Sequence, residues 1–167
     1  MTKHANLVRL FLARAEKGKE RPFLWHKQGG AWVPRSWVQV AEQVSALSQA
    51  LKRLGLEPGD RVMLVSENRP EFCIADLAIM TAGCITVPTY TTNTEADHTH
   101  ILNDSGARAV IVSSAKFAKP LLPAIVRTGH AHHVIHIDPL SIGQTGEISY
   151  HAWSKLIADE IPDLKAM

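Results

Sequence analysis

The chain has 167 residues, of which 46% are hydrophobic and 20% are charged, with a formal net charge of +2. This length is enough to bury one hydrophobic core. The proportion of hydrophobic to charged residues excludes an intrinsically disordered chain. Acidic and basic residues alternate between Arg14 and Arg21, which excludes the one-sided basic arm of a nucleic-acid-binding protein. The first residues lack the apolar region of a secretory signal. We therefore expect a cytoplasmic protein without a nucleic-acid partner.

The first third of the chain predicts a helix, a β-hairpin and a second helix. Apolar residues of the first helix have helical spacing before a glycine: Leu7, Leu10, Phe11 and Ala15, then Gly18. Two apolar runs, 23–27 and 31–33, flank Gly29 and Gly30, which is typical of a hairpin. Ser36 and Gln39 predict a capping box. The helix that follows has one apolar face, made of Val40, Val44, Leu47, Leu51 and Leu54.

The rest of the chain alternates short apolar runs with helical segments. Strands are predicted at residues 62–65, 84–87, 109–112 and 134–137, and helices at 70–82, 94–105 and 115–127. Asn68 is predicted to cap the helix that begins near Pro70, and Ser149 to cap a final helix through Trp153 and Leu156. The alternation predicts an α/β fold: an open, mostly parallel sheet with helices on both faces, plus the amino-terminal hairpin.

An uncharged stretch from Leu77 to Thr94 approaches the length of a membrane span. It contains Gly83, Pro88 and many Thr and Asn residues, which a uniformly apolar helix would not carry. A helix end, a buried strand and a polar loop explain it better. We therefore expect no transmembrane segment.

The loop after the second predicted strand is the best candidate for a substrate-binding site. In open parallel sheets, ligands bind beyond the carboxyl ends of the strands. This loop places an aromatic ring, hydroxyl groups and an amide at such an end: Tyr90, Thr91, Thr92 and Asn93. The alternative, which stays open, is a polar connection whose side chains only satisfy backbone groups.

No set of residues indicates a catalytic nucleophile or a metal site. The chain has no Gly-x-Ser-x-Gly elbow, so we predict no catalytic residue within it. Segment 130–136 is rich in histidine, but neither a carboxylate nor a thiol is interleaved with the imidazoles. A strand entered from a His-rich loop is favoured over metal binding there, and both interpretations stay open.

Four segments resemble a known family. Gly55-Leu-Glu-Pro-Gly-Asp-Arg-Val62 and Ser66-Glu-Asn-Arg-Pro-Glu71 are similar to the amino-terminal region of adenylate-forming enzymes. Ala82-Gly-Cys-Ile-Thr-Val-Pro-Thr-Tyr-Thr-Thr-Asn-Thr94 and His100-Ile-Leu-Asn-Asp-Ser-Gly-Ala-Arg108 resemble segments of long-chain fatty-acid–CoA ligases. The resemblance extends roughly from Pro22 to Leu156. It implies a full-length enzyme that uses ATP and Mg²⁺ to adenylate a fatty acid and then transfers the acyl group to CoA.

The phosphate-gripping loop of that family, a Ser/Thr/Gly-rich run ending in Pro-Lys-Gly, has no counterpart among these residues. The nearest run, Ser141 to Gly146, is followed by Glu147, which would repel phosphate. We therefore expect residues 1–167 to form the amino-terminal portion of the large domain, without that loop and the carboxy-terminal domain. This portion is expected to be inactive alone and to bind none of ATP, Mg²⁺ and CoA tightly.

Its expected partners are the remainder of the ligase chain and, in the full-length enzyme, the fatty acid. Alone, the chain is expected to self-associate through exposed apolar surface. The alternative is a naturally truncated, non-catalytic binding or interaction module with the same fold.

Overall fold

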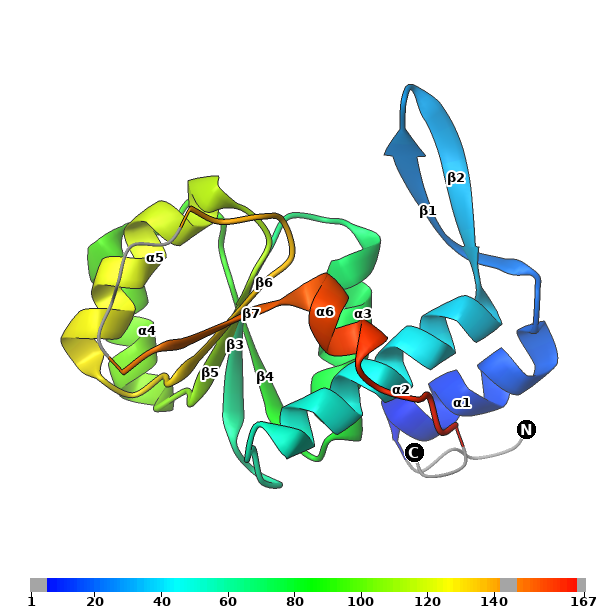
Figure 1. Ribbon diagram of the computed structural model, residues 1–167, viewed down its shortest axis with the longest axis horizontal. Helices are drawn as coiled ribbons and strands as arrows, with labels where there is room; N and C mark the ends of the chain where they lie inside the picture. The colour runs from blue at the N-terminus through cyan, green and yellow to red at the C-terminus, as the bar shows by residue number, and fades with distance from the viewer. Residues whose placement is uncertain (1–5, 142–146, 165–167) are drawn as a thin grey trace.

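The computed structural model describes residues 6–141 and 147–164. A five-stranded parallel sheet, with helices on both faces, forms the body of the protein (Figure 1). The strand order is β4-β3-β5-β6-β7. The strands are β3 (Arg61–Val65), β4 (Ile85–Thr89), β5 (Ala109–Val112), β6 (His133–His136) and β7 (Ser149–Ala152). The predicted fold class is confirmed, and all four predicted strands are present.

Two hydrophobic cores lie on opposite faces of the sheet, and alternate residues of β3 divide between them. Val62 and Leu64 belong to the core formed with α1 (Leu7–Gly18), α2 (Trp37–Arg53), α3 (Pro70–Thr81) and α6 (Trp153–Ala158). Met63 and Val65 belong to the core formed with α4 (Glu95–Ser105) and α5 (Ala115–Thr128). Because β3 is covered on both faces, its sequence is a continuous apolar run rather than an alternating one.

The predicted start of α2 is confirmed in detail. The backbone N–H of Gln39 donates to Ser36 Oγ, and the backbone N–H of Ser36 donates to Gln39 Oε1. The apolar face of the helix is fully buried at Val40, Val44, Leu47 and Leu51. Gly55 follows the helix with a φ of +84°, a conformation that only glycine adopts easily.

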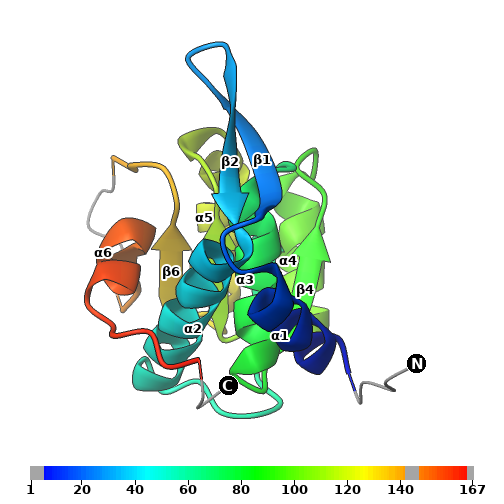
Figure 2. The ribbon, with the colours of Figure 1, turned by 90° about the vertical axis from the view of Figure 1, so that its right-hand side faces the viewer.

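The hairpin, β1 (Pro22–Gln28) and β2 (Ala31–Ser36), projects from the body near the amino ends of α2 and α3 (Figures 1 and 2). Its turn residues Gly29 and Gly30 both have positive φ, as a tight hairpin turn requires. At its base the rings of Phe23 and Trp37 stack with centroids 3.7 Å apart. The hairpin is therefore anchored to the body by packed aromatic rings.

Two of the predicted helix caps are wrong. Ser149 does not cap a helix, because it begins the edge strand β7, and α6 starts only at Trp153. The main-chain ladder with β6 pairs Ser149 with His133, and this non-local pairing decides its conformation. Asn68 lies one residue too early: Arg69 occupies the cap position of α3, and among the described residues no side chain caps that helix. Pro70 at the first helical position presets the backbone instead.

The stretch from Leu77 to Thr94 comprises the end of α3, strand β4 and a polar loop, as predicted. Across residues 6–141 and 147–164, we find no helix with both the length and the apolar character that crossing a membrane requires.

His133 on β6 and His151 on β7 form a pair, with His133 Nδ1 and His151 Nε2 3.2 Å apart. Burial lowers the pKa of both rings, and nearby positive charge lowers each pKa further. For His151 that charge comes from His133, Arg53 and His136. For His133 that charge comes from His132 and Arg108. Both rings therefore favour the neutral form in the folded protein.

We predict that the free energy of unfolding decreases as the pH falls through about 6.5, because the unfolded chain then binds protons that the folded pair resists. His151→Gln removes one ring of the pair and should weaken this pH dependence. The matched control is His100→Gln, on the exposed side of α4, which should keep the wild-type profile. Urea unfolding at a series of pH values measures the effect. Identical profiles for both variants would contradict the assignment.

Candidate functional site

The carboxyl ends of the parallel strands meet at one edge of the sheet, on the side from which the hairpin projects (Figure 1). A cavity of about 590 Å³ lies there between two loops. Residues 66–68, which follow β3, form one wall, and Pro88–Thr91 at the end of β4 form the other, with Phe72 of α3 beside them. This is the position at which an open parallel sheet binds its ligands.

The structure places two of the four predicted site residues on this cavity. Tyr90 is 80% exposed and Thr91 is half-buried, and both line it. Thr92 and Asn93 are not among its lining residues. The backbone N–H of Asn93 instead donates to the carbonyl of Tyr90 at 3.3 Å, which closes a turn. A role in substrate binding stays a prediction for all four residues.

Thr89 adds a polar group that the sequence did not single out. Its Oγ1 is buried and has no hydrogen-bond partner among the described residues, although the residue lines the cavity. An unpaired buried hydroxyl costs free energy until water or a ligand pairs with it. Thr89 therefore offers the cavity one unused donor and acceptor.

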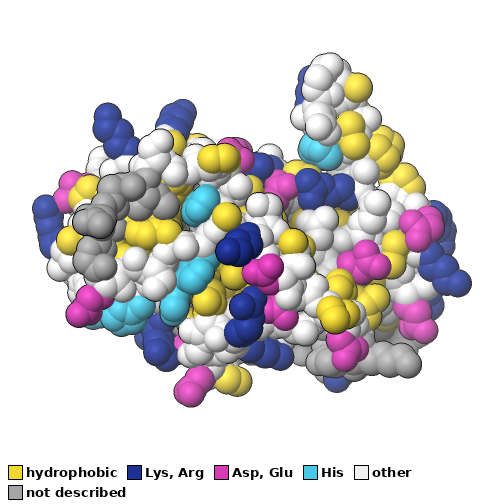
Figure 3. Space-filling model, in the orientation of Figure 1, with side chains coloured by type: hydrophobic (Ala, Val, Ile, Leu, Met, Phe, Trp, Pro, Cys, Tyr) yellow, Lys and Arg dark blue, Asp and Glu magenta, His cyan; other side chains and the backbone are white. Residues whose placement is uncertain are grey.

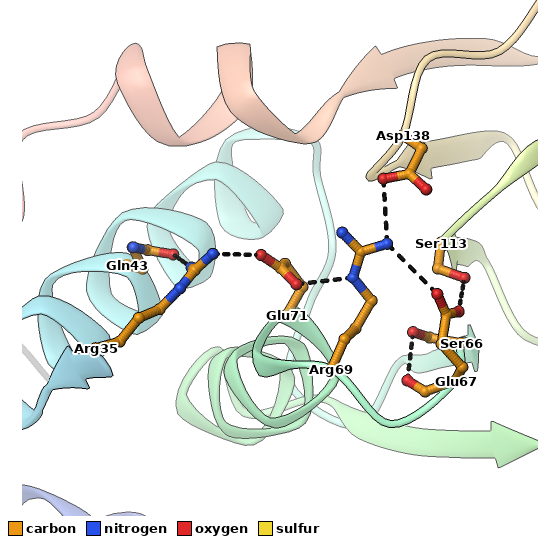
Figure 4. A network of polar contacts seen from close by, with 8 residues as sticks. All are labelled: Arg35, Gln43, Ser66, Glu67, Arg69, Glu71, Ser113 and Asp138. Atoms are coloured by element: carbon orange, nitrogen blue, oxygen red, sulfur yellow. Dashed lines mark hydrogen bonds and ion pairs between the residues drawn. The ribbon is translucent and has the colours of Figure 1, made fainter. Parts of the chain in front are cut away.

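Beside the cavity, a network of charged side chains connects the loops of this edge (Figure 4). Arg69 lies at its centre. Its Nε donates to Glu71 Oε2 at 2.8 Å, and its Nη1 donates to Asp138 Oδ1 at 3.1 Å. The same Nη1 lies 3.6 Å from Glu67 Oε1. One guanidinium group thus contacts three carboxylates, from the loop after β3, from α3 and from the loop after β6.

Glu71 is the buried member of this network, at 8% exposure. Arg35, near the end of the hairpin, donates from Nη2 to Glu71 Oε1 at 2.7 Å and from Nη1 to Gln43 Oε1 at 3.1 Å. Burial by itself would raise the pKa of Glu71, but the hydrogen bond from Arg69 and the charges of both arginines outweigh it. The pKa of Glu71 therefore lies below its ordinary value, and the carboxylate stays charged between two guanidinium groups.

Glu67 connects the network to the centre of the sheet. Its Oε2 accepts a short hydrogen bond from the hydroxyl of Ser113, which directly follows β5. Ser66 donates from its hydroxyl to the carbonyl of Glu67 at 2.9 Å. These contacts hold the loop that forms one wall of the cavity.

The charge of this edge does not fit a triphosphate. Three carboxylates surround Arg69, and Arg35 is paired with Glu71, so neither guanidinium is free to bind phosphate. The run from Ser141 to Gly146 lies almost wholly outside the described residues. Within the ranges the structure describes, no three His, Cys, Asp or Glu side chains converge as metal ligands. The paired arginines of this edge are therefore poorly placed to bind phosphate.

Sequence reasoning missed this network. The sequence predicts Asn68 only as a helix cap and gives no separate role to Glu67 or Glu71. Glu71 does lie in the first turn of α3, but its main partners are Arg35 and Arg69. The available signal was the mixture of charges directly after a buried strand, in a segment that resembled a family motif.

Comparison with known proteins identifies the family. Residues 11–163 match the family described as AMP-binding enzyme. The chain belongs to this family. A long-chain-fatty-acid–CoA ligase of Salmonella typhimurium is 30% identical over 138 residues, which cover 80% of this chain and 23% of that protein. One from Mycobacterium tuberculosis is 38% identical over 78 residues, covering 47% of this chain and 13% of that protein.

Solved structures of two CoA ligases share the fold. An anthranilate CoA ligase in complex with anthranoyl-AMP aligns with a TM-score of 0.82 and 21% identity, over 100% of this chain and 30% of that one. A benzoate CoA ligase from Burkholderia xenovorans aligns with a TM-score of 0.77 and 23% identity, over 95% of this chain and 29% of that one. In these comparisons the chain spans less than a third of the length of its relatives.

We predict that Glu71→Gln lowers the free energy of unfolding by about 2 kcal/mol near neutral pH, because two partly buried guanidinium groups lose their shared carboxylate. Since the pKa of Glu71 is lowered by folding, its contribution is present above its unfolded pKa and is lost as the pH falls below about 4. The deficit of the variant should therefore shrink in acid.

The matched control is Glu95→Gln, because Glu95 pairs with Arg127 on the surface, with side chains 36% and 65% exposed. This change should cost less than about 0.5 kcal/mol. Urea unfolding of both variants at neutral and acid pH measures the difference. An equal loss in the two variants would show that the Glu71 network does not stabilise the fold.

Proposed function

We propose that this AMP-binding family chain forms the amino-terminal part of a fatty-acid–CoA ligase and provides one wall of its acyl-binding cleft. The observation that carries the proposal is the 30% identity to a long-chain-fatty-acid–CoA ligase across 80% of the chain. The cavity at the carboxyl edge, with the exposed ring of Tyr90 and no free cation among its described lining residues, supports an acyl ligand over a phosphate.

In the reaction proposed for the whole ligase, the fatty-acid carboxylate attacks the α-phosphorus of ATP and releases pyrophosphate. The CoA thiol then displaces AMP from the acyl-adenylate and forms the thioester. Because the described edge does not fit phosphate, we assign ATP, Mg²⁺ and CoA binding to parts of a ligase outside this chain. The residues here would hold the acyl wall in place through the network around Arg69, and the proposed compartment is the cytoplasm.

Sequencing the coding region beyond the codon for Met167 is the first test. We expect an open frame that reaches a Ser/Thr/Gly-rich run ending in Pro-Lys-Gly. The product of that frame should release pyrophosphate only when fatty acid and ATP are both present, whereas the 167-residue chain should release none. A stop codon directly after Met167 would instead support the non-catalytic module, and acyl-CoA formation by the short chain would overturn its proposed inactivity.

Strand β4 lies at the edge of the sheet and is less covered than the central strands. Ile85 is 52% exposed on it, and one side of the strand has no neighbouring strand among the described residues. An open edge of this kind presents unpaired backbone groups and pairs readily with further strands. This feature supports the proposal that β4 contacts the remainder of a ligase chain.

Alone, the 167-residue chain is therefore predicted to self-associate as its concentration rises, which light scattering measures. Ile85→Lys should shift the chain toward the monomer, because a charge on an edge strand opposes strand pairing. Val126→Lys, at a residue on α5 that is 57% exposed, is the matched control and should leave association unchanged. A wild-type chain that stays monomeric at high concentration would contradict the prediction.

A further inference from the structure

Residues 149–164 form a strap that crosses the outside of the fold. Strand β7 lies at one edge of the sheet, and β6 is its only neighbouring strand among the described residues. Helix α6 then packs on α2 (Figures 1 and 2), with Trp153 and Leu156 each 6% exposed. The strap therefore depends on β6 and α2 for its place on the body.

Polar contacts with α2 hold the end of the strap. The pairs are Arg53 with Glu160, Gln49 with the carbonyl of Ile161, and Ser45 with the backbone N–H of Asp163, at 2.6, 3.1 and 2.9 Å. The side chain of Arg53 is 52% exposed, and an ion pair with such exposure adds little stability. Segments held by few buried contacts open at a lower free energy than central strands do. We therefore expect the strap to open before the rest of the fold.

Two imidazole rings join β6 to β7 at the start of the strap. His133 Nδ1 and His151 Nε2 are 3.2 Å apart, and the ring centroids are 5.3 Å apart. At this distance one nitrogen donates a hydrogen atom and the other accepts it. When both rings are protonated, both nitrogens carry hydrogen, and two positive charges repel each other. The pair thus holds β7 only while at least one ring is neutral.

The charged groups around the pair are mainly basic. Besides burial, four basic side chains lower the pKa of one ring or the other, and one backbone hydrogen bond raises that of His133: the side chains of His132, Arg108, Arg53 and His136, and the backbone of Leu54. Arg108 is paired with Asp60 at 3.0 Å and Arg53 with Glu160, so these two carboxylates already have partners. Figure 3 shows histidine side chains near basic and acidic ones on this face of the molecule. The surroundings therefore oppose a second proton on the pair.

We propose that the strap is an acid-sensitive switch, in which protonation of the His133–His151 pair releases β7 and α6 while the central strands stay folded. Release exposes one edge of β6 and the part of α2 that α6 covers. The pair joins only the outermost strand to its neighbour, so the order β4-β3-β5-β6 does not depend on it. The proposal does not depend on the ligase assignment.

The direction of the switch follows from proton uptake. Rings released into water have an ordinary pKa of about 6.5, whereas burial and positive charge lower the pKa of both rings in the closed strap. The closed form is therefore favoured above about pH 6.5 and loses stability as the pH falls below it. If opening binds one additional proton, its equilibrium constant rises about tenfold between pH 7.5 and pH 5.5.

Hydrogen–deuterium exchange of the 167-residue chain, measured by mass spectrometry at pH 7.5 and 5.5, tests the proposal. Protection factors, corrected for the intrinsic exchange rate at each pH, give the opening equilibrium of each segment. We expect the protection of residues 149–158 to fall about tenfold or more between the two pH values. At both values it should stay below the protection of β3, a central strand that exchanges through unfolding of the whole fold.

His151→Gln keeps a side chain that donates or accepts a hydrogen bond but does not titrate, so the loss of protection in acid should shrink to less than about threefold. His133→Gln should have the same effect from the other side of the pair. His100→Gln, on the exposed side of α4, is the matched control and should keep the full loss. Circular dichroism at pH 7.5 checks that each variant is folded.

Equal protection of the strap and of β3 at both pH values would show that the strap opens only with the whole fold, which overturns the proposal. Unchanged protection of the wild-type strap between pH 7.5 and 5.5 also overturns it. A full loss of protection in acid that persists in both glutamine variants would overturn the role of the His133–His151 pair, and with it the proposal.

Discussion

The arrangement of the loops at the carboxyl edge of the sheet depends on one buried carboxylate, that of Glu71. Glu71 is almost fully buried, and a charge in that position is stable only when opposite charges and hydrogen bonds compensate for the lost water. Arg35 provides compensation from the hairpin and Arg69 from the loop before α3. The same carboxylate thereby joins two parts of the fold that share no strand ladder. The hairpin is held at its angle by this pair as well as by its aromatic base.

Arg69 connects Glu71 to two loops that are distant in the sequence. It reaches Asp138 after β6 and Glu67 after β3, and Glu67 in turn accepts from Ser113 after β5. These loops lie together because crossover connections in a parallel sheet return every strand in the same direction. Their carboxyl ends therefore meet at one edge, and polar groups placed there by distant parts of the sequence become neighbours. The cavity beside Tyr90 is a consequence of the same geometry.

The charges at the carboxyl edge of the sheet bear on whether this part of the chain binds a nucleotide. Carboxylates outnumber the guanidinium groups around Arg69, and both arginines are already paired. Such a network can position loops, but it cannot gather the negative charge of a nucleotide. This agrees with the proposal that parts of a ligase outside this chain bind the nucleotide, since the chain spans less than a third of the relatives compared here. The hairpin adds a surface of different character, aromatic and cationic, on the same side of the protein.

Local chemistry was sufficient to predict most elements from the sequence. The capping box of Ser36 and Gln39, the glycine turn of the hairpin and the apolar run of β3 each depend on residues near in sequence, so each was predicted correctly. The parallel sheet followed from the alternation of strands and helices.

Tertiary structure alone decided the rest. Ser149 became a strand residue because β6 offered it a partner, and Arg69, not Asn68, took the cap position of α3. The pairing of Glu71 with Arg35 joins residues 36 positions apart, and that of Arg69 with Asp138 joins residues 69 apart. No periodicity or spacing records such pairs, because their energy exists only after the chain has folded and buried them together.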